Sequence, residues 1–404
     1  MRRPGAWQIY IDHAADLWLL HHKYGRMKKM ERQINRPEGD VTEVSLDTFP
    51  GIRVGQTENA QAGTGLTVMI SEDPDGMAAG LHIGGGGPAT RETGILDPIT
   101  TAQRIHAAVL GGGSAFGLDA AGGVMKYLEE KGIGVTVLDI HVPLVTQVDI
   151  FDLAVGDSRV RPDQEMGYAA CKMSEKGVRG NFRSGNYGAG CGATIGKYAG
   201  RDGVMKSGIG SCVLRHGDLL VGAIISVNAL GDVYDWKTGQ KVAGAYAEDG
   251  RFYDSREMIT FLRKMEEARD GAARAEGFSG GTGGVVLPKA ALNTTIGIVF
   301  TNAPFKKPEL CKIAAMAHDG FARSIAPVHT AGDGDSIIAV SVNSAYKEPG
   351  AKTDDGDGEQ GLTASAGIDT VGSLAAWASS EAILRAVRSA ASAYGFRALQ
   401  DMEK

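Results

Sequence analysis

One short apolar segment constrains the fold of this chain more than any other feature. Residues 294–301 contain two threonines followed by a run of isoleucine, glycine, valine and phenylalanine, and Asn302, Ala303 and Pro304 come directly after it. This length and β-branched content predict a strand, and the lack of alternating polar residues indicates that both of its faces are buried. Such a strand needs a covering layer on each side.

Other strands and helices alternate along the chain without regular βαβ units. We expect strands at 65–70, 78–83 and 219–227, and helices from Ser114 to Gly132, from Ser255 to Asp270, from Pro308 onward and near the C-terminus. Ser114 is expected to cap its helix. Together with the doubly buried strand, this pattern predicts an α/β protein in which two sheets are stacked between helix layers.

Glycine is the compositional outlier, with 58 residues among 404, and it clusters in loops rather than repeating with a period. This distribution excludes a collagen-like chain and is typical of tight turns around a site. The run Gly84–Gly87 could bind an anion, because bare backbone amides do so. No glycine loop ends in the Gly-Lys-Ser/Thr sequence of a P-loop, which argues against nucleotide binding.

The overall composition excludes several functions. A formal net charge of −6 provides no general attraction for nucleic acid or an anionic membrane, and no apolar run approaches the ~18 residues of a membrane helix. The four cysteines show no CxxC spacing, and there is no HExxH motif. We therefore expect a cytoplasmic protein without metal or organic cofactor.

The first 40 residues differ from the rest. Their longest apolar patch, Leu17–Leu20, is too short for a secretory signal, and they are rich in lysine and arginine. We interpret residues 1–40 as an extension and residues 41–404 as a single domain. Residues 348–363 are acidic and glycine-rich and are expected to form a surface loop.

Thr294 could act as a nucleophile under one condition. The glycine-rich segment 278–284 precedes the strand that this threonine opens. If the peptide bond before Thr294 were cut, one residue would carry both a hydroxyl nucleophile and an α-amine that titrates near pH ~7.7 to 8.0 and can serve as its general base. A threonine at the start of a strand is also ordinary, since β-branching suits a sheet.

Four polar residues lie beside predicted strands or glycine loops. Lys197 follows a glycine-rich loop, Asn228 ends a strand, and Asp333 and Asp335 precede another strand. Two carboxylates at i and i+2 can point the same way, so that one holds the other partly protonated. Each also has an ordinary interpretation: a surface lysine, a turn asparagine and an Asp-Gly-Asp turn.

Several segments resemble the DmpA family, the group of L-aminopeptidase/D-esterases and β-aminopeptidases that includes a nylon-oligomer hydrolase. The matching segments are Asn293–Ile296, Thr301–Pro304, Gly112–Leu118, Val142–Pro143 and Ile150–Leu153. The resemblance covers roughly residues 45–395. It implies a four-layer αββα sandwich like that of N-terminal-nucleophile hydrolases, and self-cleavage between Asn293 and Thr294 into chains 1–293 and 294–404.

The resemblance also assigns roles to individual residues. It makes Thr294 the nucleophile and Asn228 a side-chain donor to the oxyanion. Lys197 steadies the nucleophile, and Asp333 and Asp335 face it. The aminopeptidase branch has Ser and Glu at the paired positions, so the two aspartates match the nylon-oligomer hydrolase better and put a strict aminopeptidase preference in doubt.

The oxyanion site differs from that of the relatives at one position. The nylon-oligomer hydrolase has a tyrosine near Phe151, and phenylalanine cannot donate a hydrogen bond. Backbone amides of Gly84–Gly87, or of the loop that contains Gly112 and Gly113, are the alternative donors.

Three functions are compatible with these residues and with the resemblance. The first is a self-processing amidase or aminopeptidase acting on small peptides or ω-amino-acid oligomers, built as an oligomer of αβ units. The second is an acyltransferase of the ornithine acetyltransferase type, which would need an acceptor amine that outcompetes water. The third is a non-catalytic module that binds an anion at its glycine loops.

Overall fold

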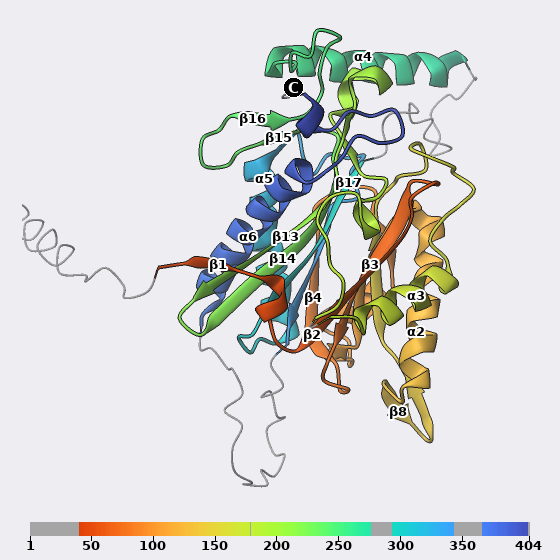
Figure 1. Cartoon of the computed structure of the whole chain (residues 1–404), viewed down its shortest axis with the longest axis vertical. Coiled ribbons are helices and arrows are strands. Elements are labelled where there is room, and N and C mark those ends of the chain that lie inside the picture. The colour runs from red at the N-terminus through yellow and green to blue at the C-terminus, as the bar shows by residue number, and fades with distance from the viewer. Residues whose placement is uncertain (1–39, 178, 276–292, 343–365, 403–404) are drawn as a thin grey trace, which may run out of the picture. The chain divides into compact units, whose positions relative to one another are not determined.

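The computed structural model describes residues 40–177, 179–275, 293–342 and 366–402 (Figure 1). Residues Glu43–Lys404 form one compact unit, from which Met1–Thr42 separate. The expected extension 1–40, apart from Asp40, lies outside the described residues. The same holds for the glycine-rich segment 278–284 and the acidic segment 348–363.

A seven-stranded sheet contains the strand that opens at Thr294. The strand order is β1-β13-β14-β17-β19-β4-β6. Strand β17 runs antiparallel to β14 and parallel to β19, and all eight of its residues are buried, as the apolar pattern predicts. The strand bounds are β1 Thr42–Val44, β4 Met77–Ile83, β6 Arg104–Ile105, β13 Ile209–His216, β14 Leu219–Asn228, β17 Thr294–Thr301 and β19 Ser336–Ser341.

A five-stranded sheet packs against the first. Its order is β2-β3-β7-β10-β5, with β10 parallel to β7 and the other pairs antiparallel. Its strands are β2 Ile52–Asn59, β3 Thr64–Ser71, β5 Ala89–Arg91, β7 Ala107–Gly111 and β10 Val145–Asp149. The strands expected at 65–70 and 78–83 are thus confirmed, and they lie in different sheets.

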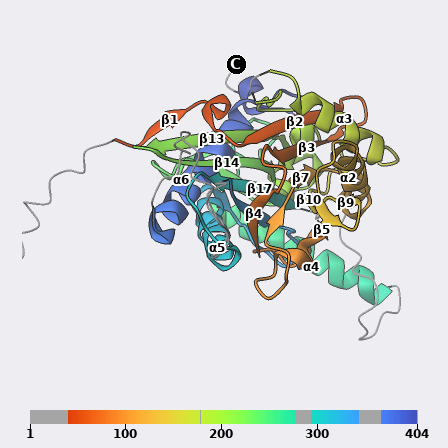
Figure 2. The same ribbon diagram turned by 90° about the horizontal axis from the view of Figure 1, so that it is seen from below.

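Two pairs of helices cover the outer faces of the sheets. Helices α5 (Lys307–Ser324) and α6 (Ile368–Arg388) pack on the seven-stranded sheet, and α2 (Ala120–Glu130) and α3 (Gln164–Ser174) pack on the five-stranded sheet. Figure 2 shows the four layers in sequence from α5 and α6 through both sheets to α2 and α3. The predicted αββα order is confirmed.

Apolar side chains between the sheets form the main core. Strands of both sheets contribute to it, and its fully buried members include Val54, Met69, Leu110, Ile224, Ile298 and Ile338. Burial of each such side chain contributes about 1.5–3 kcal/mol. Because aliphatic side chains from both sheets fill this space, polar groups of the site can lie only where the strands end.

The smaller elements connect these layers. Helix α4 (Ser255–Ala275) confirms the amphipathic helix expected from Ser255. Minor strands are β8 Val135–Val137, β9 Ile140–Val142, β11 Thr194–Ile195, β12 Met205–Lys206, β15 Asp232–Tyr234, β16 Lys241–Ala243 and β18 Ile325–Ala326. The 3-10 helices are Leu46–Thr48, Thr93–Leu96, Ser114–Asp119, Gly188–Gly190, Lys197–Ala199, Arg201–Gly203 and Leu399–Asp401.

The predicted cap at Ser114 is wrong. Gly113 occupies the N-cap position, no side chain caps the helix, and Ser114 itself has a left-handed φ of 53°. The chain turns sharply from β7 into the 3-10 helix, so the hydroxyl does not lie over the first helical amides. Among the described residues, no helix is long and apolar enough to cross a membrane.

Candidate active site

Thr294 begins a strand in the interior of the seven-stranded sheet. It pairs with Asn228, the last residue of β14, and β19 flanks β17 on the other side. Only 5% of Thr294 is exposed. The predicted nucleophile and the predicted oxyanion donor are therefore register partners on neighbouring strands, although 65 residues separate them in the chain.

The carbonyl group before Thr294 receives two hydrogen bonds. The Thr294 hydroxyl donates to the carbonyl oxygen of Asn293, and the backbone N–H of Gly334 donates to the same oxygen over 3.0 Å. A parallel bridge between Asn293 and Asp333 brings the Gly334 amide to this position. Two donors on one carbonyl polarise it toward attack. Sequence reasoning missed Gly334, whose contribution comes from its backbone.

Three groups hold the carboxamide of Asn228. Its Oδ1 accepts from the backbone N–H of Thr194 at 3.0 Å and from Lys197 Nζ at 2.6 Å, and its Nδ2 donates to the carbonyl oxygen of Phe151 at 2.9 Å. Since both donors contact Oδ1, the orientation of the amide is fixed. Phe151 thus contributes its backbone carbonyl to the site, and the Asn228 amide nitrogen carries a second N–H that this contact does not use.

Lys197 is buried beneath the site. Besides Asn228 Oδ1, its ammonium nitrogen contacts the Asn228 backbone oxygen at 3.0 Å. Burial lowers the pKa of Lys197 to about 7, against the opposing pull of the carboxylates of Asp333, Asp152 and Asp335. The surface interpretation of this lysine is wrong, because the left-handed Gly196 turns the chain inward at this point.

Asp333 is a buried carboxyl group with an unused oxygen. Its Oδ2 accepts the Thr330 N–H at 2.7 Å, whereas its Oδ1 is buried without a hydrogen-bond partner among the described residues. Burial, followed by the charge of Asp335, raises the pKa of Asp333 to about 6. The expected partial protonation of one member of the pair is consistent with this shift.

Asp335 is fully engaged by hydrogen bonds. Its Oδ1 accepts the Thr295 N–H at 2.6 Å, and its Oδ2 accepts the backbone N–H of His329 at 3.0 Å and contacts His329 Nδ1 at 2.8 Å. Asp335 therefore ties the residue after the nucleophile to a histidine six positions upstream. His329 lies just before the Asp-Gly-Asp segment in the sequence, but the sequence pattern alone did not indicate a role for it.

The polyglycine run Gly84–Gly87 fixes the loop that contains both aspartates. Its four amides donate to carbonyl oxygens of that loop: Gly84 and Gly85 to Asp335, Gly86 to Thr330 and Gly87 to Asp333. A Cβ on Gly85 would lie 2.2 Å from the Asp333 oxygen, so only glycine permits this approach. Anion binding or oxyanion donation by this run stays a prediction, and the present arrangement does not favour it, because its amides already have acceptors within the chain.

The amides of Gly112 and Gly113 have different acceptors, and only Gly113 donates to Asp152. The Gly112 amide donates to the Gly65 carbonyl at 2.9 Å, and the Gly113 amide donates to Asp152 Oδ1 at 2.7 Å. Thr64 Oγ1 donates to the other oxygen of Asp152 at 2.7 Å. Burial raises the pKa of Asp152 to about 6. A direct oxyanion role for the two glycines stays a prediction, although these two amides have acceptors in the present arrangement.

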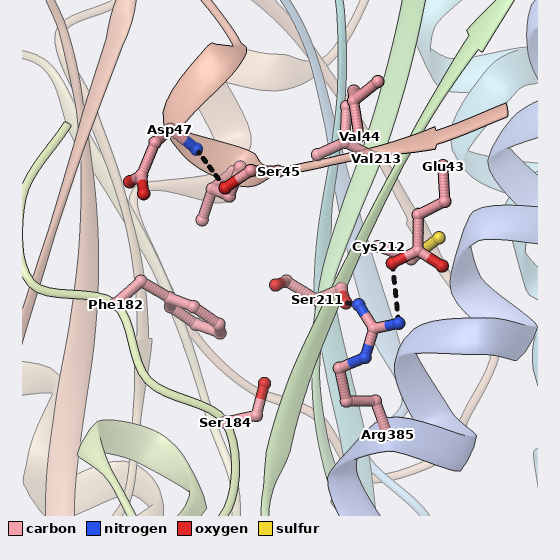
Figure 3. Close-up of a pocket in the computed structure, with 11 residues that line it drawn as sticks. Glu43, Val44, Ser45, Asp47, Phe182, Ser184, Ser211, Cys212, Val213 and Arg385 are labelled. Atoms are coloured by element: carbon pink, nitrogen blue, oxygen red, sulfur yellow. Dashed lines mark hydrogen bonds and ion pairs between the residues drawn. The ribbon is translucent and has the colours of Figure 1, made fainter. Parts of the chain in front are cut away.

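The described surface also has a cavity of about 470 Å³ (Figure 3). It lies beside β13, where Arg385 reaches from α6 to Glu43 at 2.6 Å and to the Ser211 carbonyl at 2.5 Å. None of the residues predicted to act in the site lines this cavity. Among the described residues, no group of three or more His, Cys, Asp or Glu is arranged to hold a metal ion.

Comparison with known proteins adds independent information. The family description Peptidase family S58 matches residues 45–400. An uncharacterized aminopeptidase of Mycobacterium leprae is 37% identical over 320 residues, which cover 76% of this chain and 79% of the relative. A 6-aminohexanoate-oligomer endohydrolase of Kocuria sp. is 30% identical over 297 residues, covering 73% and 74%.

Solved structures share the fold at low sequence identity. The L-aminopeptidase D-Ala-esterase/amidase of Ochrobactrum anthropi, described as a variant of the Ntn hydrolase fold, aligns with a TM-score of 0.57 at 17% identity and covers 86% of each chain. A Burkholderia sp. β-aminopeptidase aligns with a TM-score of 0.54 at 18% identity, covering 90% of this chain and 95% of the other. The four-layer architecture is thus that of the Ntn hydrolase variant.

Proposed function

The chain belongs to peptidase family S58 and is a hydrolase of amide bonds, and we propose that it activates itself by cutting the bond between Asn293 and Thr294. The observation that carries this proposal is the contact between the Thr294 hydroxyl and the Asn293 carbonyl oxygen, which also accepts the Gly334 N–H. Nucleophile, scissile carbonyl and a backbone donor are already together in the uncut chain.

Maturation proceeds in two steps. The Thr294 oxygen attacks the carbonyl carbon of Asn293, the C–N bond breaks, and the hydroxyl proton passes to the nitrogen. The nitrogen becomes the free α-amine of Thr294, and the acyl group is left on the threonine oxygen as an ester. Water then hydrolyses the ester. One product ends in the carboxylate of Asn293, and the other begins with Thr294 and carries hydroxyl and amine on one residue.

In turnover, the mature Thr294 attacks a substrate amide and its own amine takes the hydroxyl proton. Asn228 offers its free N–H to the oxyanion, because Thr194 and Lys197 hold the opposite end of the carboxamide. The Oδ1 of Asp333, which has no hydrogen-bond partner among the described residues, accepts an N–H of the new amine. The leaving amine departs, and water hydrolyses the acyl-enzyme to regenerate Thr294.

We assign small peptides and linear ω-amino-acid amides as substrates. The names of the aminopeptidase and the 6-aminohexanoate-oligomer endohydrolase among the relatives support this range. Parallel assays with aminoacyl p-nitroanilides and 6-aminohexanoate oligomers, each with and without an added acceptor amine, separate exo-cleavage, endo-cleavage and acyl transfer. Assembly into oligomers of αβ units stays a prediction, which light scattering of the cleaved protein can check.

Intact mass under denaturing conditions tests the self-cleavage directly. We expect two polypeptides, 1–293 and 294–404, and N-terminal sequencing of the shorter one should begin Thr-Thr-Ile-Gly. Active protein that remains a single uncut chain would refute the mechanism, whereas an uncut and inactive preparation points to failed maturation and is repeated after incubation.

A further inference from the structure

A line of hydrogen-bonded groups leads away from the site beneath α5. Asp335 Oδ2 contacts His329 Nδ1 at 2.8 Å, His329 Nε2 contacts His318 Nδ1 at 3.2 Å, and His318 Nε2 contacts the carbonyl oxygen of His82 at 3.1 Å. The two imidazole rings cross edge to face with centroids 4.6 Å apart. Each ring nitrogen in this line therefore has a defined neighbour.

The chemistry of these neighbours fixes the number of protons. The His82 carbonyl can only accept, so His318 Nε2 carries a hydrogen. The contact between His329 and His318 then needs one more hydrogen on one of the two facing nitrogens, and the contact with Asp335 needs another. Three hydrogens thus serve three contacts. An ionised carboxylate with two neutral imidazoles supplies only two, so three hydrogen bonds along this line would require one proton more than that state.

The two histidine side chains differ in burial. His318 is only 5% exposed, and burial lowers its pKa to about 4, which disfavours a second proton there. The His329 side chain keeps 23% of its surface exposed and can be hydrated as an imidazolium. The three contacts to Asp335 from Thr295 and His329 satisfy an ionised carboxylate.

We propose that His329 is a positioning residue that remains an imidazolium paired with Asp335, and that it thereby keeps the α-amine of mature Thr294 uncharged near neutral pH. This inference rests on the proposed function. Without a compensating cation, the carboxylate of Asp335 would favour the ammonium form of that amine, which cannot accept a proton. His329 cancels this influence while Asp335 still holds the Thr295 amide.

Other titratable groups lie near this line of contacts. Asp333 and Asp152 are carboxyl groups on the side of the nucleophile, and Lys197 opposes them from below. On the α5 side, His82 and Lys312 are the titratable neighbours. Among the described residues, only His329 has a ring nitrogen in contact with an Asp335 oxygen, so its removal changes the net charge at Asp335 most directly.

The test compares His329→Gln with His82→Gln in the cleaved enzyme. Glutamine at position 329 can still donate to Asp335 but carries no charge. We expect the acidic limb of the kcat/KM profile to move about one pH unit upward, with the alkaline plateau retained. His82→Gln preserves the backbone carbonyl and should leave the profile in place. An unshifted profile for a cleaved His329→Gln enzyme would overturn the inference.

Nitrogen NMR of histidine-labelled wild-type enzyme gives a measurement that needs no active variant. We expect two protonated ring nitrogens on His329 at pH 7, assigned by correlating its ring signals with its own backbone signals in the wild-type enzyme. A single protonated nitrogen on His329 at this pH would refute the proposal even if His329→Gln misfolded. Failure of the proposed function is distinguishable, because it would show as an uncut active wild type before any histidine is changed.

Discussion

Two carboxylate pairs lie beside two glycine loops, one in each sheet, and they differ in how their oxygens are used. At the seven-stranded sheet, Asp333 and Asp335 lie against Gly84–Gly87, and Asp333 Oδ1 has no partner among the described residues. At the five-stranded sheet, Asp152 accepts from Gly113 and Thr64, and both oxygens of Asp149 accept from Gln147. The first pair therefore has a carboxylate oxygen that can still accept a hydrogen bond, whereas the oxygens of the second pair already have donors.

This difference separates a reactive site from its support. Burial raises the pKa of Asp149 and Asp152 as it does that of Asp333. A perturbed carboxyl group therefore does not by itself identify a catalytic residue. The distinguishing features are a free acceptor and a nearby nucleophile. Substitutions at the nucleophile, in the two loops and at the two carboxylates test whether this contrast holds.

Removal of the nucleophile should have the largest effect. In Thr294→Ala, we expect no cleavage and a loss of activity of about 10³-fold or more, since no other group supplies the attacking oxygen. Denaturing electrophoresis and an amide-hydrolysis assay measure both. Thr295→Val is the matched control, because the Thr295 hydroxyl is buried without a partner among the described residues and its amide is retained. Cleavage of the Thr294→Ala chain at this bond would refute the assignment.

An alanine substitution in the loop of each carboxylate pair should distinguish an effect on cleavage from an effect on stability. In Gly334→Ala, the new Cβ would lie 2.8 Å from Thr294 Oγ1 and 2.9 Å from the Gly87 carbonyl oxygen, so we expect maturation to slow by about 10²-fold with a smaller loss of stability. Gly113 has a φ of 79°, and alanine there should cost about 1–3 kcal/mol of stability while cleavage continues. Timed gels and thermal melts of both variants decide whether the two effects separate in this way.

The two carboxylates should differ in the same sense. Asp333→Asn leaves one side-chain oxygen, which accepts the Thr330 N–H, and places an NH2 group toward the amine, so kcat should fall about 10²-fold with little change in melting temperature. Asp152→Ala leaves the Gly113 amide and the Thr64 hydroxyl without their acceptor, which should cost about 1–3 kcal/mol in the free energy of unfolding. Equal loss of kcat in both variants would show that the supporting pair takes part in catalysis.

The last prediction concerns the pH dependence of stability, which activity assays do not register. The pKa of Asp152 is about 6 in the folded chain against 3.8 ordinarily, so the folded state binds the proton more tightly. Its contribution to stability is full below pH ~4 and is lost as the pH rises to about 6, by at most about 1.4 kcal/mol per pH unit. Asp152→Asn should flatten this slope in denaturant titrations, and an unchanged slope would contradict the shift.

Much of the fold follows from apolar patterning. The run after Thr294 indicates a strand buried on both faces, and the spacing after Ser255 indicates a helix, because burial in a sheet or on one helix face requires those patterns. The local geometry at Ser114 could not be predicted, since the left-handed turn depends on how β7 meets the following helix.

The candidate site was predictable in its side chains but not in its backbone. Thr294, Asn228, Lys197, Asp333 and Asp335 do lie together. The role of the Gly334 amide could be recognised only from the bridge between Asn293 and Asp333 in the structure. Every residue except proline has a backbone N–H, so the sequence does not indicate which one acts as a donor. The role of His329 depends on contacts with α5, which no local sequence pattern reveals.

The place of the proposed cut inside the sheet has a mechanical consequence. New termini usually fray, yet a scission before Thr294 would leave that residue paired with Asn228 of β14, and β17 paired with β19 from Ile296 onward. The ladder from Val221 and Thr301 to Asn228 and Thr294 would survive intact. The two chains would therefore stay associated through the sheet. The new α-amine would already be fixed in place and would lose little conformational entropy on reaching the transition state.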